Sequence, residues 1–209
     1  MDEATATVYV VDDEPDVLKA LTRLLGAAGF SVEAFASPEQ FLAQRDDTAP
    51  GCVVLDLALP GLNGLELQQT LQAQGSALPI VFLTGRGDIA ASVRAMKRGA
   101  ADFLTKPVDA DELIGAVHGA LERNRETRAA RAEQQLVAGL LGALTTRERE
   151  VFELIAAGWL NKQIAAEFGA VEKTIKFHRA NLMRKLGVRT VADLVRLAER
   201  AGAILPPSA

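Results

Sequence analysis

Residues 52–63 read CVVLDLALPGLN, and this stretch decides the fold. Its first four residues, Cys52–Leu55, are all apolar, which is typical of a strand that is buried on both faces of a parallel sheet. The strand is followed by Asp56. Asn63 is a residue type that caps helices, so we expect a helix from there to about Gln74. The stretch therefore predicts one strand–helix unit with a carboxylate at the end of the strand.

The same unit repeats on both sides of this stretch. Each apolar run is followed by a helical pattern, and we expect Ser37 and Asp109 to cap two of these helices. Five alternating strand–helix pairs predict an α/β fold, a doubly wound parallel sheet with helices on both faces. The other four predicted strands are residues 7–11, 31–35, 79–83 and 101–104.

Chemically distinctive side chains follow four of the predicted strands. In a doubly wound sheet these strands lie side by side, so we expect the five side chains to meet at one edge. Carboxylates that converge repel one another unless a cation is present, and hard oxygen ligands suit Mg²⁺ better than zinc. A lysine and a hydroxyl suit a phosphoryl group, and an aspartate can accept one as a nucleophile. The residues are Asp12, Asp13, Asp56, Thr84 and Lys106.

Each of these residues also has a plain structural interpretation. Paired aspartates at the end of a strand often only cap the next helix, and Thr-Gly after a strand is commonly a turn. The favoured interpretation is a site, because all five residues follow the strands of one predicted sheet.

Composition limits the remaining classes. Cys52 is the only cysteine, which excludes an intrachain disulfide and a four-cysteine zinc site. The chain starts without a basic leader and has no apolar stretch of about 18 residues, so we expect a cytoplasmic protein with no membrane partner. Residues 1–120 carry 17 acidic and 8 basic side chains, whereas residues 145–209 carry 7 and 11. This asymmetry favours two domains, the second of which binds a polyanion.

The back segment reads as four helices. Thr145–Glu148 has the pattern of a capping box, and Asn161 is expected to cap a short helix over 162–168. A longer helix is expected at about 171–186 and should end at Gly187. A fourth helix is expected to begin at Thr190. A short helix, a glycine turn and a longer basic helix form the helix-turn-helix layout.

The longer helix has two different faces. Helical spacing places Val171, Ile175, His178, Leu182 and Leu186 on the core face, so His178 is interpreted as a buried structural residue. The opposite face carries Phe177, whose ring suits a thymine methyl group in the major groove, although packing against another domain remains an alternative. The basic residues near it suit phosphate and base contacts, and a solvated face is the plain alternative. The opposite face consists of Lys173, Phe177, Ala180 and Arg184, with Lys176 at its side.

Residues 121–144 connect the two parts. They are charged and alanine-rich, and Leu136, Leu140 and Leu144 continue an apolar stripe, so we expect a helical extension and then a connector. A solvated linker is the alternative.

The front half resembles a known family. The segments VVDDEPDV, VLDLALPGLNGLEL, IVFLTGRGD and MKRGAADFLTKP resemble the receiver domain of bacterial two-component response regulators, a flavodoxin-like fold, over about residues 5–122. The resemblance implies that Asp56 accepts phosphate from a sensor histidine kinase. It implies direct Mg²⁺ ligation by Asp13, Asp56 and the Ala58 carbonyl, with Asp12 acting through water. It also implies roles for four further residues: Lys106 contacts the phosphoryl group, Thr84 swings inward to it, Phe103 follows into the vacated space, and Pro107 carries a cis bond.

The back half resembles a second family. The segments LTTREREVFELIAAG, NKQIA and TIKFHRANLMRKLGVRT resemble the LuxR/FixJ-type DNA-binding domain from about Leu144 to Ala203. The resemblance implies that the domain binds double-stranded promoter DNA through Lys173, Thr174, Lys176, Phe177 and Arg179. We add Arg184 to this set because it lies on the same face of the helix. It implies a dimer surface on the last helix and RNA polymerase as a further partner. Val171 replaces the serine that usually caps the recognition helix, so that start is expected either to fray or to gain core contacts.

These observations predict a phosphorylation-dependent DNA-binding transcriptional regulator of a two-component phosphorelay, which forms a homodimer on activation. Its parts are a receiver at 1–122, a helical linker at 123–143 and a helix-turn-helix domain at 144–209. The expected chemistry is limited to slow hydrolysis of its own acyl phosphate, so the chain is not classed as an enzyme. Two alternatives remain: a constitutive dimer module that needs no phosphate, and a metal-dependent phosphohydrolase. The second lacks a clear acid for the leaving group and leaves the basic helices unexplained.

Overall fold

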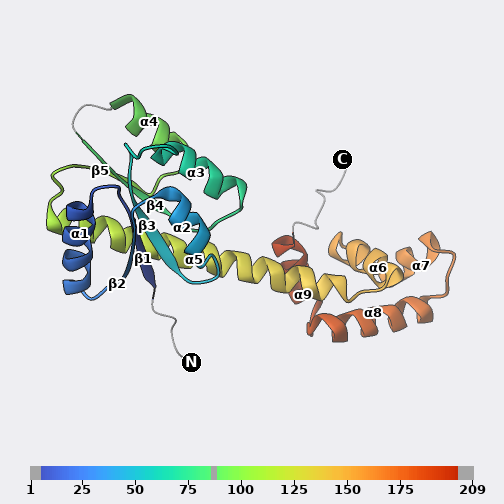
Figure 1. The fold of residues 1–209 in the computed structure, drawn as a ribbon. Helices are drawn as coiled ribbons and strands as arrows, with labels where there is room; N and C mark the ends of the chain where they lie inside the picture. The colour runs from blue at the N-terminus through green and yellow to red at the C-terminus, as the bar shows by residue number, and fades with distance from the viewer. Residues whose placement is uncertain (1–5, 86–88, 202–209) are drawn as a thin grey trace. The chain divides into compact units, whose positions relative to one another are not determined.

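The computed structural model describes residues 6–85 and 89–201 and divides into two compact units, Met1–Ala129 and Ala130–Ala209. The first unit is built around a parallel five-stranded sheet of order β2-β1-β3-β4-β5 (Figure 1). It contains β1 (Thr7–Val11), α1 (Pro15–Ala27), β2 (Ser31–Phe35), α2 (Pro38–Gln44), β3 (Gly51–Asp56), α3 (Gly64–Ala73), β4 (Ile80–Thr84), α4 (Ile89–Lys97), β5 (Asp102–Thr105) and the start of α5 (Ala110–Gly142). The predicted doubly wound fold is confirmed.

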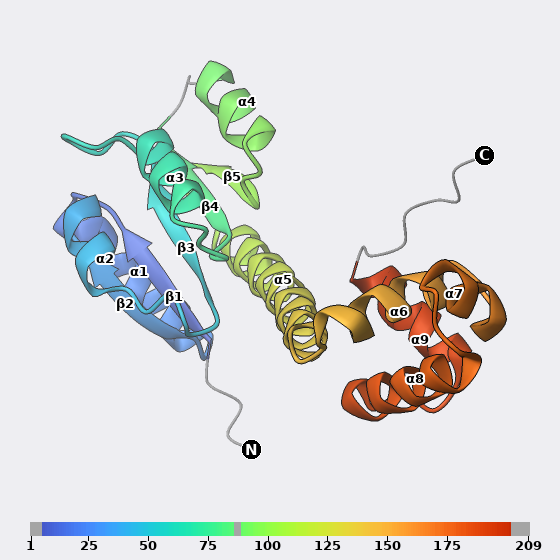
Figure 2. The same ribbon diagram turned by 90° about the vertical axis from the view of Figure 1, so that its right-hand side faces the viewer.

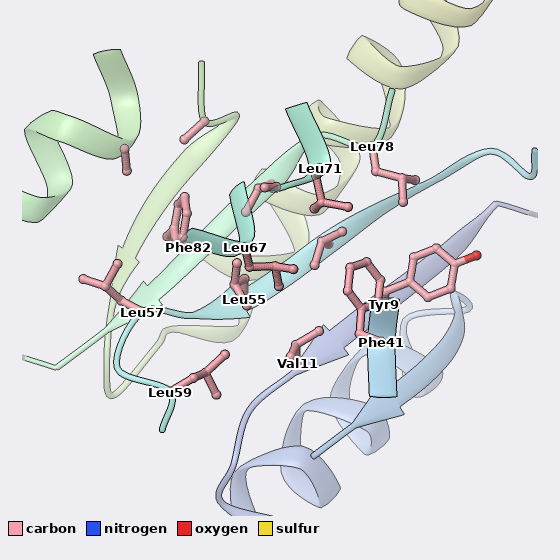
Figure 3. Close-up of a cluster of buried hydrophobic side chains, with 14 of the residues drawn as sticks. Tyr9, Val11, Phe41, Leu55, Leu57, Leu59, Leu67, Leu71, Leu78 and Phe82 are labelled. Atoms are coloured by element: carbon pink, nitrogen blue, oxygen red, sulfur yellow. The ribbon is translucent and has the colours of Figure 1, made fainter. Parts of the chain in front are cut away.

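Alternate residues of each strand face opposite sides of the sheet. Tyr9 and Val11 belong to the cluster on the side of α2, α3 and α4 (Figure 3), whereas Val8 and Val10 belong to the cluster on the side of α1 and α5. Both clusters are buried, which explains why β1, β3 and β4 are continuous apolar runs.

The predicted caps of the sheet helices are present. The Asn63 side chain accepts from the Glu66 N–H and the Glu66 side chain accepts from the Asn63 N–H, so α3 begins with a capping box. The Ser37 side chain caps α2 by accepting from the N–H of Gln40. β4 and β5 both lie one residue later than predicted, at Ile80–Thr84 and Asp102–Thr105.

α5 is one continuous helix (Figure 2). In the first unit, buried Asn124 accepts from the Gly51 N–H at 3.1 Å and donates to the Ala77 carbonyl at 2.7 Å. In the second unit, Val137 and Leu141 lie in the core. The predicted leucine stripe is wrong at its first member, because Leu136 is 66% exposed. The helix faces the second core through Val137 instead.

The second unit contains the end of α5, α6 (Thr146–Ala156), α7 (Asn161–Glu167), α8 (Glu172–Leu186) and α9 (Val191–Arg200). Capping boxes at Thr145 and Thr190 begin α6 and α9, and Gly187 ends α8 in the left-handed conformation, with φ at 68°. A short turn joins α7 to α8 (Figure 1), as the helix-turn-helix prediction requires.

Three expectations for this unit are corrected. The cap position of α7 is Leu160 rather than Asn161, and the Gln163 side chain accepts from the Leu160 N–H at 2.8 Å. Val171 is the cap position of α8 and is 68% exposed, so it gains no core contact. His178 is only half-buried, because the buried stripe of α8 runs through Ile175, Leu182 and Leu186.

Candidate phosphoacceptor site and DNA-binding surface

Lys106 joins two of the predicted acids at the carboxyl edge of the sheet. Its Nζ lies 2.7 Å from Asp12 Oδ2 and 2.9 Å from Asp56 Oδ1. Glu14 Oε1 is further away, at 3.9 Å. β1 and β3 are neighbours and β5 is separated from β3 only by β4, so the sheet order itself brings these side chains to one place.

Both carboxylates are buried, with Asp12 1% and Asp56 5% exposed. Each therefore needs compensation for lost hydration. The Glu14 N–H donates to Asp12 Oδ1 at 2.9 Å, and the Ala58 N–H donates to Asp56 Oδ2 at 3.0 Å. One ammonium and two backbone N–H groups thus stabilise two adjacent negative charges.

The environment of Lys106 keeps its ammonium charged. Burial acts to lower the pKa of Lys106, but hydrogen bonds to Asp12 and Asp56 and the charges of both acids outweigh it and raise this pKa above the ordinary value. The Lys106 N–H donates to the Thr84 carbonyl at 2.6 Å, and the Lys106–Pro107 bond is cis as expected.

The other predicted site residues are placed differently. Asp13 is exposed, and among the described residues it forms no hydrogen bond or ion pair with Lys106. Within residues 6–85 and 89–201, no three or more histidine, cysteine or acidic side chains group as a metal site. The donors that fit a hard cation at this edge are the oxygens of Asp12 and Asp56, with exposed Asp13 and Ala58 next to them in the chain.

Thr84 and Phe103 lie on the adjacent strands. The buried Thr84 hydroxyl donates to the Gly85 carbonyl at 3.2 Å. Phe103 is half-buried and packs against the core with its ring centroid 6.2 Å from that of Phe82. If either side chain moved toward Asp56, it would therefore have to break the contact that it makes in this structure.

A groove of about 560 Å³ adjoins the site. It is formed mainly by α1 and by the segment after β5, and Lys106 and Glu14 are among its polar lining residues. Its apolar lining consists of Val17, Ala20, Leu21, Leu83, Pro107 and Val108.

The predicted DNA-contact residues of α8 are mostly on its free side. Phe177 is 64% exposed, which confirms that it lies on the solvent face. Lys176 pairs with Glu172 at 3.0 Å. Arg179 differs, since it is half-buried and donates from Nη1 to Asn161 Oδ1 at 3.1 Å. The exposed members of the predicted set are Lys173, Thr174, Lys176, Phe177 and Arg184.

An ion pair that the sequence analysis missed fastens α8 to α6. Lys185 Nζ lies 2.6 Å from Glu148 Oε2. This hydrogen bond, together with bonds from Thr145, lowers the pKa of Glu148 to about 2. The capping-box pattern identified Glu148, but its partner lies in another helix and local spacing does not reveal it.

No helix in the described part of the chain is both long enough and apolar enough to cross a bilayer. Comparison with known families matches residues 8–118 to the response regulator receiver domain and residues 142–198 to the LuxR family of bacterial regulatory proteins.

Curated relatives match over nearly the whole chain. Nodulation protein W of Bradyrhizobium diazoefficiens is 43% identical over 197 residues, which cover 94% of this chain and 87% of the relative. Response regulator protein TodT of Pseudomonas putida is 40% identical over 200 residues, covering 96% and 88%. Among solved structures, response regulator StyR has a TM-score of 0.86 at 47% identity and covers 94% of this chain and 100% of that one. Full-length FixJ from B. japonicum has a TM-score of 0.59 at 39% identity, covering 97% and 100%. The chain therefore belongs to the LuxR/FixJ-type response regulators, transcriptional regulators that join a receiver domain to a helix-turn-helix DNA-binding domain.

Proposed function

We propose that Asp56 is the phosphoacceptor of this regulator. The observation that carries the proposal is the contact of one ammonium, that of Lys106, with two buried carboxylates, Asp12 and Asp56, at the open edge of the sheet. An oxygen of Asp56 attacks the phosphorus of a phosphohistidine on the sensor kinase. The P–N bond breaks, its electron pair stays on the imidazole nitrogen, and an acyl phosphate forms.

The neighbouring residues prepare this step. Lys106 neutralises charge on the incoming phosphoryl group, and the Ala58 N–H holds the second oxygen of Asp56. A bound Mg²⁺ supplies charge neutralisation for the phosphoryl oxygens, and Asp13, Asp56 and the Ala58 carbonyl would hold it with Asp12 acting through water. The groove along α1 adjoins Lys106 and offers an apolar surface to the kinase.

Phosphate on Asp56 regulates the second unit. Thr84 exchanges its bond to Gly85 for one to the phosphoryl group, and Phe103 turns inward. The protein then dimerises on promoter DNA, and in a dimer the two α8 helices read half-sites about one helical turn apart. Lys173, Thr174, Lys176, Phe177 and Arg184 provide the contacts, Arg179 supports them from beside Asn161, and RNA polymerase is the further partner.

The same proposal assigns residues 1–122 to the receiver, 123–143 to a linker and 144–209 to the DNA-binding domain of a cytoplasmic protein. The acyl phosphate hydrolyses slowly on its own, and no external substrate is turned over.

The test is mass in solution and DNA binding, each with Mg²⁺ in the presence and absence of beryllofluoride. We expect a monomer that dimerises and binds DNA more tightly with beryllofluoride, and an Asp56→Asn variant that does neither. Unchanged mass and affinity in the parent protein would favour a phosphate-independent DNA-binding protein. Steady hydrolysis of a small phosphoester would favour a phosphohydrolase.

A further inference from the structure

The part of α4 whose side chains the structure describes has little apolar attachment to the receiver. Among its side chains that the structure describes, residues 92–97, Ala95 is the only buried one. Val93 and Met96, its large apolar residues there, are about half exposed. By contrast, α3 buries Leu67 and Leu71 in the core (Figure 3). Polar contacts also hold this part of α4.

These contacts come from a group of three glutamines on α3. Gln68 donates from Nε2 to the carbonyls of Ala95 and Arg98, at 3.3 and 3.4 Å. Gln72 donates from Nε2 to the same Arg98 carbonyl. Gln69, with its amide oxygen turned toward the guanidinium, accepts from Nη1 and Nη2 of Arg98 at 2.8 and 2.9 Å. We call Gln68, Gln69 and Gln72 the glutamine tether.

The tether acts on the carboxyl end of α4. The last carbonyls of a helix have no partner within it, and the Arg98 carbonyl, just past the end of α4, accepts from Gln68 and Gln72. The Ala95 carbonyl also accepts from the Arg98 and Ala100 N–H groups, so the bond from Gln68 adds to a turn that the backbone already closes. Arg98 also begins the short turn through Gly99 and Ala100 that leads into β5, the strand that carries Phe103 and precedes Lys106. The tether therefore holds the segment that links α4 to the site.

One atom of the tether is poorly accommodated. Gln68 is 1% exposed, yet its Oε1 has no hydrogen-bond partner in the described part of the chain. A buried acceptor without a partner is destabilising. The free-energy cost of burying the unpartnered Oε1 therefore offsets part of the gain from the two long bonds that Nε2 donates. The free-energy difference between the tethered position of α4 and one in which α4 has moved away is therefore smaller.

We propose that the glutamine tether holds α4 in the phosphate-free position and that phosphorylation of Asp56 releases it. This inference rests on the proposed function of Asp56. The tether sets how readily the receiver is activated, because each bond to α4 favours the inactive arrangement and the unpartnered Oε1 of Gln68 keeps that preference small.

Two variants test the tether. Gln68→Leu keeps most of the side-chain volume but removes both donors and the unpartnered acceptor. Gln72→Ala removes a bond at an exposed position, where the fold is at less risk. The matched control is Gln44→Leu, since Gln44 is an exposed glutamine of α2 whose side chain has no hydrogen bond in the described structure.

The measurement is hydrogen exchange of the Arg98, Gly99 and Ala100 amides, which donate to carbonyls of α4. Without beryllofluoride, we expect exchange roughly two- to tenfold faster in Gln68→Leu and Gln72→Ala than in the parent and in Gln44→Leu, the range set by one or two net hydrogen bonds. With beryllofluoride and Mg²⁺, exchange in the parent should rise toward that of the variants. By thermodynamic linkage, the variants should also reach half-saturation at a lower beryllofluoride concentration than the parent.

The outcomes separate the two proposals. If the parent responds to beryllofluoride through Asp56 but neither variant changes exchange or half-saturation, the tether is refuted and the phosphoacceptor stands. If the parent responds but these three amides do not, release of α4 is refuted. If the parent and Asp56→Asn behave alike with beryllofluoride, the phosphoacceptor proposal fails, and regulation by the tether fails with it.

Discussion

Replacing Lys106 with methionine should destabilise the receiver. Methionine keeps an unbranched apolar chain but leaves Asp12 and Asp56, both nearly inaccessible to solvent, without the ammonium that contacts them at 2.7 and 2.9 Å. Breaking a buried ion pair costs about 3–5 kcal/mol. The Lys106 side chain is 22% exposed, which places the expected loss at the lower end of that range.

The loss comes from the two carboxylates that remain. Without Lys106, the backbone N–H groups of Glu14 and Ala58 still donate to two adjacent buried charges, but no cation balances them. We therefore expect the free energy of unfolding of the receiver to fall by about 3 kcal/mol at pH 7.

The chain provides a probe for each unit. Cys52, the only cysteine, is fully buried in β3, and burial raises the pKa of its thiol to about 12, so it reacts with thiol reagents only when the receiver opens. Labelling of Cys52 against urea concentration measures receiver stability, and fluorescence of Trp159, the only tryptophan, follows the second unit separately.

Two variants complete the experiment. Lys19→Met makes the same change at an exposed position of α1 and should shift stability by less than about 0.5 kcal/mol. Lys106→Met with Asp12→Asn removes one of the two repelling charges and should recover most of the loss. A loss no larger than that of Lys19→Met, or no recovery in the double variant, would refute the argument that Lys106 balances two buried carboxylates.

Three further predictions concern other contacts. Glu148→Gln should lower the stability of the second unit at pH 7 by about 1–3 kcal/mol in tryptophan-monitored urea unfolding. Because folding lowers the pKa of Glu148 to about 2, its contribution is complete above its unfolded pKa near 4.5 and is lost as pH falls toward 2; a difference that persists unchanged at pH 2 would contradict this. Asn124→Leu should cost the receiver about 1–3 kcal/mol by Cys52 labelling, because the Gly51 N–H and the Ala77 carbonyl lose their buried partner; parent-like labelling would contradict it. In DNA-binding titrations, Phe177→Ala should weaken binding to the cognate site more than to random DNA, whereas Lys176→Ala should weaken both alike and reduce the salt slope by about one; the reverse pattern would show that the residues have exchanged roles.

The sequence was sufficient to predict the sheet because its signals are local. Continuous apolar runs such as Cys52–Leu55 have few alternatives to a buried strand, and Asn63, Ser37 and Thr145 cap helices through bonds to residues three positions away. Parallel strand order then brought Asp12, Asp56 and Lys106 together as expected.

The errors arose where packing between elements decides the outcome. Val171 shares its helical phase with Ile175, but it lies at the cap, beyond the part of α8 that packs on the core. Asn161 is a good cap residue, yet its side chain accepts a hydrogen bond from Arg179 of the next helix. The Leu160 N–H donates to the Gln163 side chain instead. The bonds of Asn124 and of the glutamine tether join residues far apart in the chain, which periodicity does not reveal.

The most direct test of the account is to locate the phosphoryl group. The full-length protein is incubated with Mg²⁺ and a small phosphodonor, and the modified residue is identified by peptide mass spectrometry in the parent, in Asp56→Asn and in Asp13→Asn. We predict one phosphoryl group on Asp56 in the parent, none in Asp56→Asn, and slower labelling in Asp13→Asn that is restored by higher Mg²⁺. Equal labelling of Asp56→Asn, or a parent labelled at another residue, would contradict the assignment of Asp56.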